Sequence, residues 1–129
     1  MSGSERLFFD TNAAIALLNG DSALHALWNQ GVWAGLSVVS VLEFLGWPQI
    51  DESMREIFRR FVERVEVIDL RAEDAALISA IIELRRSCAV KLPDAIVLAS
   101  AKLARAMLIT RDARLLRVAE DTGVEVWRE

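Results

Sequence analysis

The sequence predicts an α/β fold in which helices cover both faces of a mostly parallel sheet. Short apolar runs such as Arg6–Asp10 (RLFFD) and Met107–Thr110 (MLIT) alternate with longer segments whose apolar residues recur at helical spacing. Strands buried on both faces read as continuous apolar runs, and strands that alternate with helices indicate parallel pairing. The 129 residues contain no repeat, low-complexity segment or linker, which predicts one domain over residues 1–129. We leave Met1–Ser4 out of this prediction, as a segment that is disordered or an added remnant.

The first half of the chain predicts two strands and four helices. The first helix stops at Asn19-Gly20, a pair typical of turns, and Asp21-Ser22 can start the next one. A second apolar run leads to Ser40 as the N-cap of a further helix, which Pro48 ends. In chain order the elements are strand Arg6–Asp10, helix Thr11–Leu18, a helix from Asp21-Ser22, strand Val32–Val39, a helix from Ser40 through Trp47 and amphipathic helix Asp51–Arg64.

The second half predicts three strands and three helices. Val65–Leu70 (VEVIDL) alternates apolar and polar residues as a strand does. Pro93–Ala106 is apolar nearly all round, which is typical of a buried helix. In chain order the elements are strand Val65–Leu70, helix Ala72–Cys88, helix Pro93–Ala106, strand Met107–Thr110, helix Arg114–Asp121 and strand Val124–Trp127.

Composition excludes several classes of protein. No apolar run approaches the roughly 20 residues that a membrane-spanning helix needs. The N-terminus lacks the regions of a secretory signal, so we expect a cytoplasmic protein. The single cysteine, Cys88, excludes an internal disulfide and cannot form a thiolate zinc site alone. A net charge of −4 differs from that of proteins that coat nucleic acid with a basic surface.

The apolar content predicts an exposed apolar surface. Hydrophobic residues make up 53% of the chain and the mean hydropathy is +0.30, which is more than a small domain encloses. We therefore expect a homodimer interface and a groove for a partner protein. The candidate faces lie on two helices and comprise Leu24, Leu27 and Trp28 on one, and Met54, Phe58 and Phe61 on the other.

Four acidic residues each lie inside an apolar run or at its end: Asp10, Glu43, Asp94 and Asp112. Two follow predicted strands, one lies on the helix after the second strand, and one starts the helix before the fourth. Ligands of open α/β sheets bind beyond the carboxyl ends of the strands, so all four can face one crevice. Gathered carboxylates are ligands for a hard cation such as Mg²⁺, and the chemistry that follows is metal-assisted phosphodiester cleavage.

Each of these acids also has a purely structural interpretation. Asp10, Asp94 and Asp112 precede or begin helices, where carboxylates accept hydrogen bonds and complement the helix dipole. Glu43 fits this reading less well, because it is the only charge in Val38–Trp47 and a buried carboxylate without a partner is costly. Its structural alternative is an exposed helix face.

The residues around the acids resemble those of the PIN-domain ribonucleases, in particular the short VapC-type toxins of toxin–antitoxin pairs. The resemblance covers about Leu7 to Trp127 and rests on FFDTNAAIALL, VVSVLEFLG, KLPDAIVLASA and LITRD, in that order. It implies a Rossmann-like α/β/α sandwich and products with a 5′-phosphate and a 3′-hydroxyl. It also implies that the four acids are the catalytic ligands of Mg²⁺ or Mn²⁺, with the polar positions of the motifs at Thr11, Asn12 and Thr110.

Electrostatics supports a bound cation independently of the resemblance. Two ionised carboxylates about 4 Å apart repel each other by roughly 4 kcal/mol at an effective dielectric of about 20. A divalent ion removes this repulsion. We expect Asp10 and Asp94 to be the main ligands, with Glu43 and Asp112 completing the set directly or through water. Asn12 and Thr110 would hold them by hydrogen bonds, and the basic residues near Asp94 and Asp112 in sequence are candidate RNA phosphate contacts: Arg85, Lys91, Arg111 and Arg114.

The sequence thus predicts a metal-dependent endoribonuclease that acts on single-stranded or loop RNA as the toxin of a toxin–antitoxin pair. Its cognate antitoxin is expected to fill the groove and place a basic side chain among the acids. One alternative is an RNA-processing or DNA-cleaving nuclease of the same fold without an antitoxin. Another is a catalytically silent module that binds a protein. A phosphoacceptor domain is weakened because no acidic pair follows the first strand.

Overall fold

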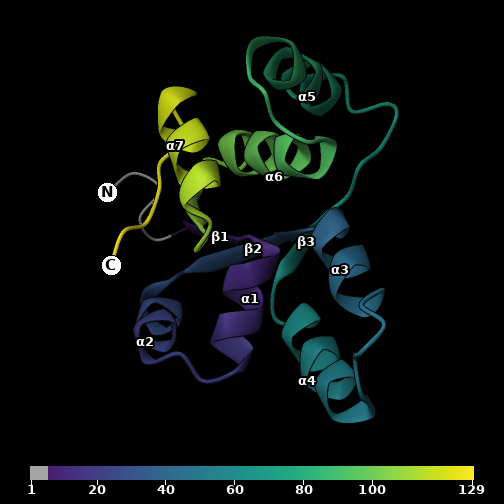
Figure 1. The fold of residues 1–129 in the computed structure, drawn as a ribbon, viewed down its shortest axis with the longest axis vertical. Helices are drawn as coiled ribbons and strands as arrows, with labels where there is room; N and C mark the ends of the chain where they lie inside the picture. Colours follow the sequence, from purple (N-terminus) through teal and green to yellow (C-terminus); the bar gives the residue numbers. More distant parts are fainter. Residues whose placement is uncertain (1–5) are drawn as a thin grey trace.

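A four-stranded, fully parallel sheet lies between two layers of helices in the computed structural model, which describes residues 6–129 (Figure 1). The strand order is β3-β2-β1-β4, so the first strand lies inside the sheet. The strands are β1 (Arg6–Phe9), β2 (Trp33–Ser37), β3 (Glu66–Ile68) and β4 (Met107–Ile109). The predicted α/β sandwich with a parallel sheet is confirmed, whereas the expectation about Met1–Ser4 lies outside the described residues.

Seven helices surround the sheet in the described part of the chain: α1 (Thr11–Leu18), α2 (Ser22–Gln30), α3 (Val38–Leu45), α4 (Glu52–Val62), α5 (Ala75–Ser87), α6 (Leu92–Leu103) and α7 (Ala113–Asp121). In Figure 1, α1, α2 and α4 cover one face, and α5, α6 and α7 cover the other. No helix within residues 6–129 is long and apolar enough to cross a bilayer.

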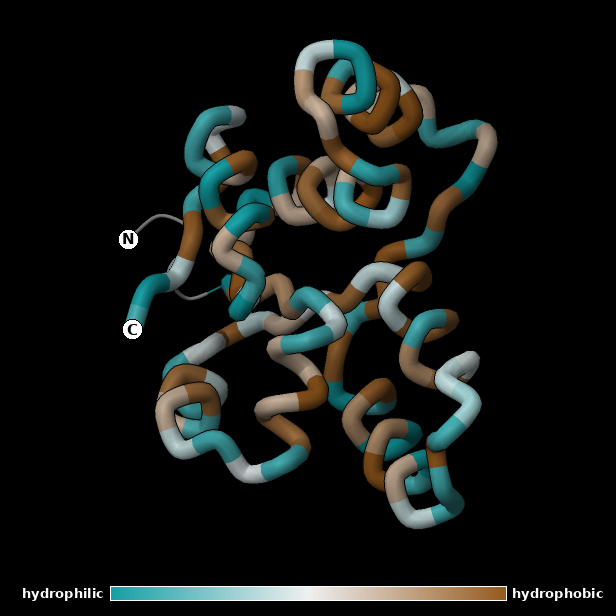
Figure 2. Tube along the Cα trace, viewed as in Figure 1, coloured by the Kyte–Doolittle hydropathy of each residue, from teal (hydrophilic) through white to brown (hydrophobic). Residues whose placement is uncertain are grey.

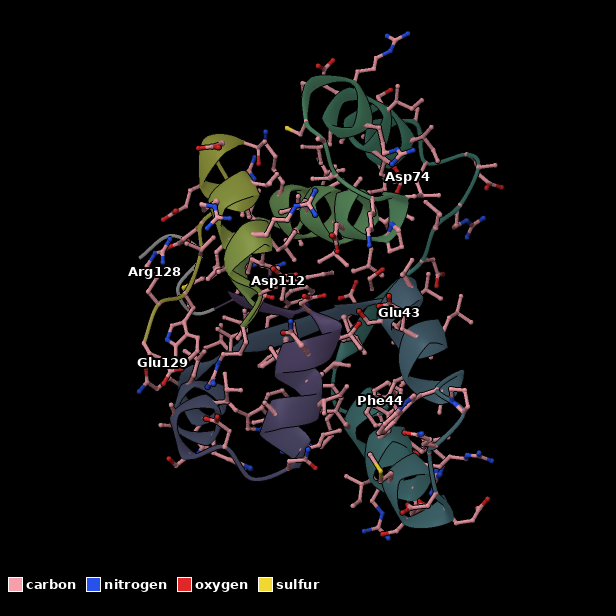
Figure 3. The ribbon with its side chains drawn as sticks, in the orientation of Figure 1. Glu43, Phe44, Asp74, Asp112, Arg128 and Glu129 are labelled. Atoms are coloured by element: carbon pink, nitrogen blue, oxygen red, sulfur yellow. The ribbon has the colours of Figure 1, made fainter. Side chains whose placement is uncertain are left out.

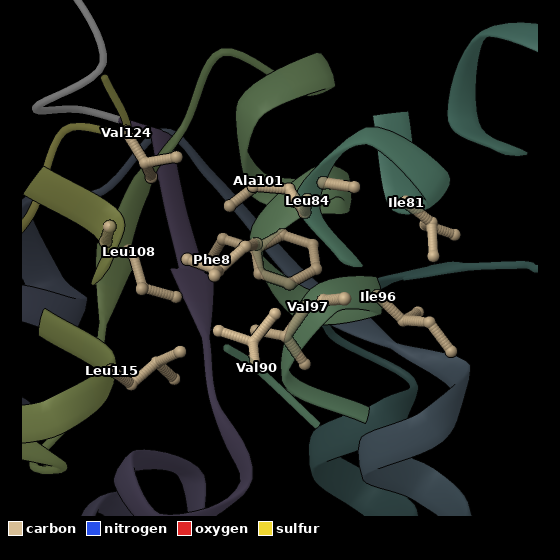
Figure 4. Close-up of a cluster of buried hydrophobic side chains, with 14 of the residues drawn as sticks. Phe8, Ile81, Leu84, Val90, Ile96, Val97, Ala101, Leu108, Leu115 and Val124 are labelled. Atoms are coloured by element: carbon tan, nitrogen blue, oxygen red, sulfur yellow. The ribbon is translucent and has the colours of Figure 1, made fainter. Parts of the chain in front are cut away.

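The molecule has one hydrophobic core on each face of the sheet. Successive strand residues contribute their side chains to these two cores alternately, as the alternation of side chains along a strand requires. Phe8 and Leu108 point toward α5, α6 and α7, where they pack with Val97, Leu84 and Leu115 (Figure 4). The apolar run that forms α6 is explained by this position, because seven consecutive residues, Ala95–Ala101, are buried.

The opposite face is filled by aromatic side chains. Phe9 projects from β1 and lies edge-on to Phe61, with ring centroids 6.2 Å apart. Phe58 stacks on Phe44 of α3 at 4.0 Å. Hydrophobic and hydrophilic residues alternate along α4 (Figure 2), and its apolar face is the one that supplies Phe58 and Phe61 to this core.

This packing corrects the predicted interaction faces. Leu24, Leu27, Phe58 and Phe61 are buried against the protein's own sheet, whereas Trp28 and Met54 are only partly buried. The amphipathic pattern identified an apolar face correctly but did not reveal that the face meets the sheet. Other apolar side chains are exposed instead, among them Val32, Leu42, Leu45, Trp47, Ile57, Ile82, Leu92 and Leu103.

Two predicted elements also differ in the structure. Strand β2 ends at Ser37, whose hydroxyl accepts a hydrogen bond from Val39 N (3.1 Å) and caps α3, so the helix starts before the predicted cap at Ser40. Val124–Trp127 is not a strand, because only Val126 forms a bridge, to Leu108. The remaining predicted elements are present with ends shifted by a few residues.

Candidate metal centre at the carboxyl edge of the sheet

The residues at which the sequence predicts a site lie where the strand order reverses around β1. From β1 the chain proceeds to β2 on one side, whereas β4 pairs with β1 on the other. Phe9 is in register with both Leu36 and Ile109, so the residues that follow leave the sheet at the same level. Such a switch point opens a crevice beyond the strand ends. Strand order could not be read from the sequence, and it is what brings Asp10 beside Thr110.

Asp10 is the most deeply placed of the four acids. Its Oδ1 accepts a hydrogen bond from Thr11 N (2.8 Å) and its Oδ2 accepts one from Thr110 Oγ1 (2.9 Å). Burial raises the pKa of Asp10, and the charges of Asp94 and Glu43 raise it further, while the two hydrogen bonds oppose the shift. The carboxylate therefore caps α1, as its structural interpretation states, and also lies in the field of two other acids.

Glu43 is joined to the same edge through the first residue of α1. Thr11 Oγ1 donates to Glu43 Oε1 (2.7 Å) and lies 2.8 Å from Ser40 Oγ. Glu43 projects into the band between the two helix layers, as does Asp112 (Figure 3). Ser40 was not selected from the sequence as a site residue. Its spacing of three residues from Glu43 on a helix was the available signal, because such residues share a face.

Asp94 differs from the other acids because its carboxylate has no hydrogen-bond or ion-pair partner among the described residues. It is half-buried in the first turn of α6 and neither accepts a hydrogen bond nor forms an ion pair within residues 6–129. Burial raises the pKa of Asp94, and the nearby charges of Asp112 and Glu43 add to the shift. Lys91 and Arg114 oppose it.

Asp112 begins α7 and is exposed. Its Oδ1 accepts hydrogen bonds from Arg114 N (2.9 Å) and Leu115 N (3.2 Å), which is the geometry of an N-cap. Its own N–H donates to Thr110 Oγ1 (3.1 Å). Thr110 therefore binds Asp10 through its proton and Asp112 through its oxygen, and it fixes the spacing between the ends of β1 and β4.

Asn12 ties α1 to the turn after β4. Its Oδ1 accepts a hydrogen bond from Arg111 N (3.0 Å) and lies 3.3 Å from Thr110 Oγ1. The Arg111 guanidinium points elsewhere and pairs with Asp21 (2.9 Å) and Glu129 (3.1 Å). Figure 3 shows Glu129 at the C-terminal end of the chain.

The donor set fits a hard divalent cation. The side chains that meet at this edge offer carboxylate, hydroxyl and amide oxygens, which Mg²⁺ and Mn²⁺ prefer. The acids are close enough to shift one another's pKa, which is the electrostatic condition that a cation relieves. Within residues 6–129, no three acidic, histidine or cysteine side chains converge on one point as they stand. A cation held by three of them would require these side chains to move closer together.

The four predicted phosphate contacts differ in what their side chains bind. Arg85 donates to the carbonyl oxygen of Val90 and Arg114 to that of Ala89. Arg111 is held by two acids. Lys91 is exposed and makes no side-chain hydrogen bond or ion pair with the described residues. Of the four, only Lys91 and Arg114 act on the pKa of Asp94.

Comparisons with known proteins agree with this architecture. The family model described as PIN domain matches residues 7–121. A toxin–antitoxin complex from Klebsiella pneumoniae contains a chain similar in structure, with 28% identity and a TM-score of 0.69 over 84% of this chain and 88% of that one. No curated protein sequence matches.

Two further solved structures share the fold at lower identity. A chain of DNA-bound VapBC from Salmonella typhimurium has a TM-score of 0.74 and 15% identity, over 95% of this chain and 96% of that one. A chain of VapBC-1 from nontypeable Haemophilus influenzae has a TM-score of 0.73 and 17% identity, over the same shares. The similarity extends over nearly the whole length of both chains.

Proposed function

This chain belongs to the PIN-domain family of nucleases, and from that premise we propose that it is a metal-dependent endoribonuclease and the toxin of a toxin–antitoxin pair. The observation that carries the proposal is Asp94. A half-buried carboxylate without a protein partner, placed beside two other acids, is costly unless a cation neutralises it. A helix-capping role does not explain it, because Asp94 caps no N–H group in the described residues.

We propose that Asp10, Glu43, Asp94 and Asp112 hold Mg²⁺ or Mn²⁺. When bound, such an ion polarises the scissile phosphate and lowers the pKa of a water molecule. The protein's own groups orient the ligands: Thr110 fixes Asp10 Oδ2 and Thr11 fixes Glu43 Oε1. Ligand-orienting hydrogen bonds of this kind are worth about 10- to 100-fold in metal affinity or activity.

The proposed substrate is single-stranded or loop RNA, cut to leave a 5′-phosphate and a 3′-hydroxyl. An acidic crevice repels a polyanion, so the approach of the backbone requires positive charge beside it. Lys91 and Arg114 supply that charge next to Asp94, and we keep them as the candidate phosphate contacts. Arg111 is less available, because substrate would have to displace Asp21 and Glu129 from its guanidinium.

Metal dependence is tested by RNA cleavage with the purified protein. We expect cleavage with Mg²⁺ or Mn²⁺, none in EDTA, and recovery when either metal is restored. Zn²⁺ should substitute poorly, because the proposed ligands include no thiolate or imidazole. Cleavage that persists in EDTA, in a preparation free of other nucleases, would contradict the proposal. Absence of cleavage with every metal would favour the silent protein-binding module.

We propose a cognate antitoxin as partner because the structural neighbours include toxin–antitoxin complexes. A groove between α1, α2 and α4 supports this, with a cavity of about 270 Å³ lined by Leu18, His25, Trp28, Ile57 and Arg60, among others. Its apolar floor and basic rim fit an amphipathic segment with acidic residues along its margin. An arginine of the antitoxin would then reach the acids at the carboxyl edge.

Genome context separates the toxin from an RNA-processing nuclease of the same fold. We expect a short reading frame immediately upstream that encodes a small DNA-binding protein. Co-expression of that protein should suppress cleavage, and the protein should co-purify with this chain. Substituting Ile57 by Asp, at the rim of the groove and 44% exposed, should weaken the complex without unfolding either protein. Failure of the upstream protein to bind would remove the toxin assignment and leave the nuclease assignment intact.

We also propose that the protein forms a homodimer. Residues 1–129 are proposed to form a single domain, and the location is proposed to be cytoplasmic. Leu42 is 67% exposed, and Leu45 and Trp47, close to it in sequence, are 43% and 41% exposed. Exposed apolar side chains of this size favour an interface between copies. Light scattering at micromolar concentration should report a mass near twice 14.4 kDa. A monomer whose stability is unchanged by Leu42→Ser would contradict the dimer.

A further inference from the structure

The segment 88–91, which joins α5 to α6, is held by an arginine from each of two helices. Arg85 Nη1 of α5 donates to the carbonyl oxygen of Val90 at 2.7 Å. Arg114 Nη2 of α7 donates to the carbonyl oxygen of Ala89 at 3.1 Å. Val90 is buried in the core between these helices, whereas both arginines are exposed. Two consecutive peptide groups are therefore fixed from two different elements.

These two hydrogen bonds hold the segment before a helix that, unlike the other helices in residues 6–129, has no side-chain cap. The N-cap residues of α1, α2, α3, α4, α5 and α7 are all Asp or Ser, and each accepts a hydrogen bond from an N–H of its own first turn. The N-cap of α6 is Lys91, whose side chain makes no cap hydrogen bond and has no acceptor to offer. The start of α6 is fixed from outside, through charge-assisted hydrogen bonds to its lead-in segment.

The start of α6 is also the part of the site with the least side-chain support. Asp10, Glu43 and Asp112 each accept hydrogen bonds that orient their carboxylates. Asp94 accepts none from the described residues, so its position depends on the backbone of the first turn. A site of this kind must be held to within about 0.5 Å, and side chains that lock the backbone supply that precision.

We propose that Arg85 and Arg114 are positioning residues: by holding segment 88–91 they set the start of α6 and keep Asp94 directed at the other three acids. This inference rests on the proposed nuclease function and reassigns Arg85 from a phosphate contact to a tether. Arg114 also acts on Asp94 through its charge, so its removal changes two properties at once. Arg85 therefore provides the cleaner test.

The test compares Arg85→Ala and Arg85→Lys with Arg86→Ala. Arg86 is the next residue of α5, is exposed, and makes no side-chain hydrogen bond or ion pair within residues 6–129, so it is a matched control. Three quantities are measured on the full chain: Mn²⁺ affinity by electron paramagnetic resonance, hydrogen exchange of the peptide spanning 88–98, and kcat and KM for RNA cleavage in Mg²⁺.

We expect Arg85→Ala to weaken Mn²⁺ binding and lower kcat by about tenfold, the lower end of losses at ligand-orienting partners. Hydrogen exchange should rise in the peptide spanning 88–98, and KM should stay near the wild-type value. Arg85→Lys, which keeps a charged donor, should restore part of the loss, and Arg86→Ala should match wild type. A role as phosphate contact would instead raise KM and its salt dependence, with Mn²⁺ affinity unchanged.

The outcomes separate this inference from the proposed function. An active wild type whose Arg85→Ala variant keeps Mn²⁺ affinity and kcat overturns the tether and leaves the nuclease proposal standing. Faster exchange in 88–98 without any change in Mn²⁺ affinity also overturns it, because Arg85 would then be structural only. A wild type that neither binds Mn²⁺ nor cleaves RNA overturns both. If Arg85→Ala lowers the melting temperature sharply, Arg85→Lys is compared with wild type instead.

Discussion

Charged side chains have favourable partners at the amino edge of the parallel sheet, whereas acids lie beside acids at its carboxyl edge. At the amino edge, Glu66 accepts a hydrogen bond from Trp33 Nε1 (3.1 Å). Arg6 lies 4.2 Å over the Trp33 ring and donates to the carbonyl oxygen of Ala104 (3.0 Å). At the carboxyl edge, acids lie beside acids, and the pKa of Asp10 and that of Asp94 are raised.

The difference separates a stabilising edge from one that costs stability. Pairing charges with donors and an aromatic ring favours the folded state. Crowding carboxylates together disfavours it, and the cost persists only where another requirement maintains it. A cation can remove that cost at the carboxyl edge. We therefore expect substitutions at the amino edge to change stability, and substitutions at the carboxyl edge to change activity.

The largest expected effect is that of Asp94→Asn. The amide keeps the shape and removes the charge, so RNA cleavage should fall by well over the roughly 100-fold that losing a ligand-orienting partner costs. The melting temperature should stay the same or rise, because repulsion from Asp112 and Glu43 is lost. Cleavage and thermal unfolding are measured on one preparation.

Asp74→Ala is the matched control for that substitution. Asp74 also precedes a helix, but its Oδ1 accepts a hydrogen bond from Leu77 N (3.1 Å), and it lines a pocket with Arg6, Trp33 and Glu66 at the other edge of the sheet. Loss of this cap should cost about 1 kcal/mol of unfolding free energy with cleavage retained. If Asp94→Asn behaved like Asp74→Ala, Asp94 would be a structural residue and the contrast between the edges would disappear.

Thr110→Val should give the next largest loss of activity. The substitution keeps the volume of a buried side chain and removes the hydroxyl that binds Asp10 Oδ2 and accepts from Asp112 N. We expect cleavage to fall by about 10- to 100-fold. Unfolding free energy should drop by about 1–3 kcal/mol, because two buried or partly buried groups lose a partner.

Thr122→Val tests whether that loss is specific to the carboxyl edge. Thr122 lies at the far end of α7 and donates to the carbonyl oxygen of Val118 (2.8 Å), away from the acids. Its replacement should leave cleavage per folded molecule unchanged. Equal losses in the two variants would mean that Thr110 acts through general stability and not through Asp10.

The strand ends and the acids were predictable because each has a local signature. RLFFD joins an apolar run directly to an acid, LITRD does so after two polar residues, and DTNAAIALL begins with residues that cap helices. The pairing of Asp10 with Thr110 was not predictable from local pattern, because it depends on β4 adding beside β1. Non-local strand order leaves no trace in the spacing of residues.

The tethers and the amino edge were equally hidden in the sequence. Arg85 and Arg114 lie on separate helices, and their shared target became visible only in three dimensions. The predicted interface faces were wrong in part, because hydrophobic periodicity reports that a helix has an apolar side without saying what covers it: Phe58 is buried, whereas Trp28 lines the groove. Phe58 and Phe61 face the sheet, whereas Leu42 and Ile57, from similar patterns, face outward.

Gly35→Ala tests the amino edge, with a smaller effect and on stability alone. A Cβ at Gly35 would lie 2.2 Å from Trp33 Cη2 and 3.0 Å from Phe8 Cδ2. The ring cannot move without disturbing its contacts with Arg6 and Glu66. We expect a loss of about 1–3 kcal/mol by denaturant unfolding, typical of overpacking, with cleavage per folded molecule unchanged.

Replacing Trp33 by Leu should make the Gly35→Ala substitution less costly. Leucine lacks the ring atoms that meet the new Cβ, so the two changes should be non-additive. Additive losses would show that the collision with Trp33 is not the cause. A loss of cleavage beyond the fraction unfolded would break the division between the two edges.

The smallest effect concerns pH and metal-free protein. The pKa of Asp94 is raised in the folded state above 3.8, the value for the unfolded chain. At a pH between the unfolded-state pKa and the folded-state pKa, the folded protein therefore binds more protons than the unfolded chain. Stability contributed by this site is therefore present at low pH and declines as pH rises through the folded-state pKa. Because the same carboxylate must be ionised to bind a cation, saturating Mg²⁺ should reverse the trend.

The difference in melting temperature between wild type and Asp94→Asn isolates this contribution from the other carboxyl groups. In EDTA, the melting temperature of wild type should fall relative to that of the variant as pH rises from 3.8 through the raised folded-state pKa of Asp94. If the difference in melting temperature between wild type and Asp94→Asn is constant across this pH range, the acids at the carboxyl edge do not destabilise the fold, and their spacing has another cause.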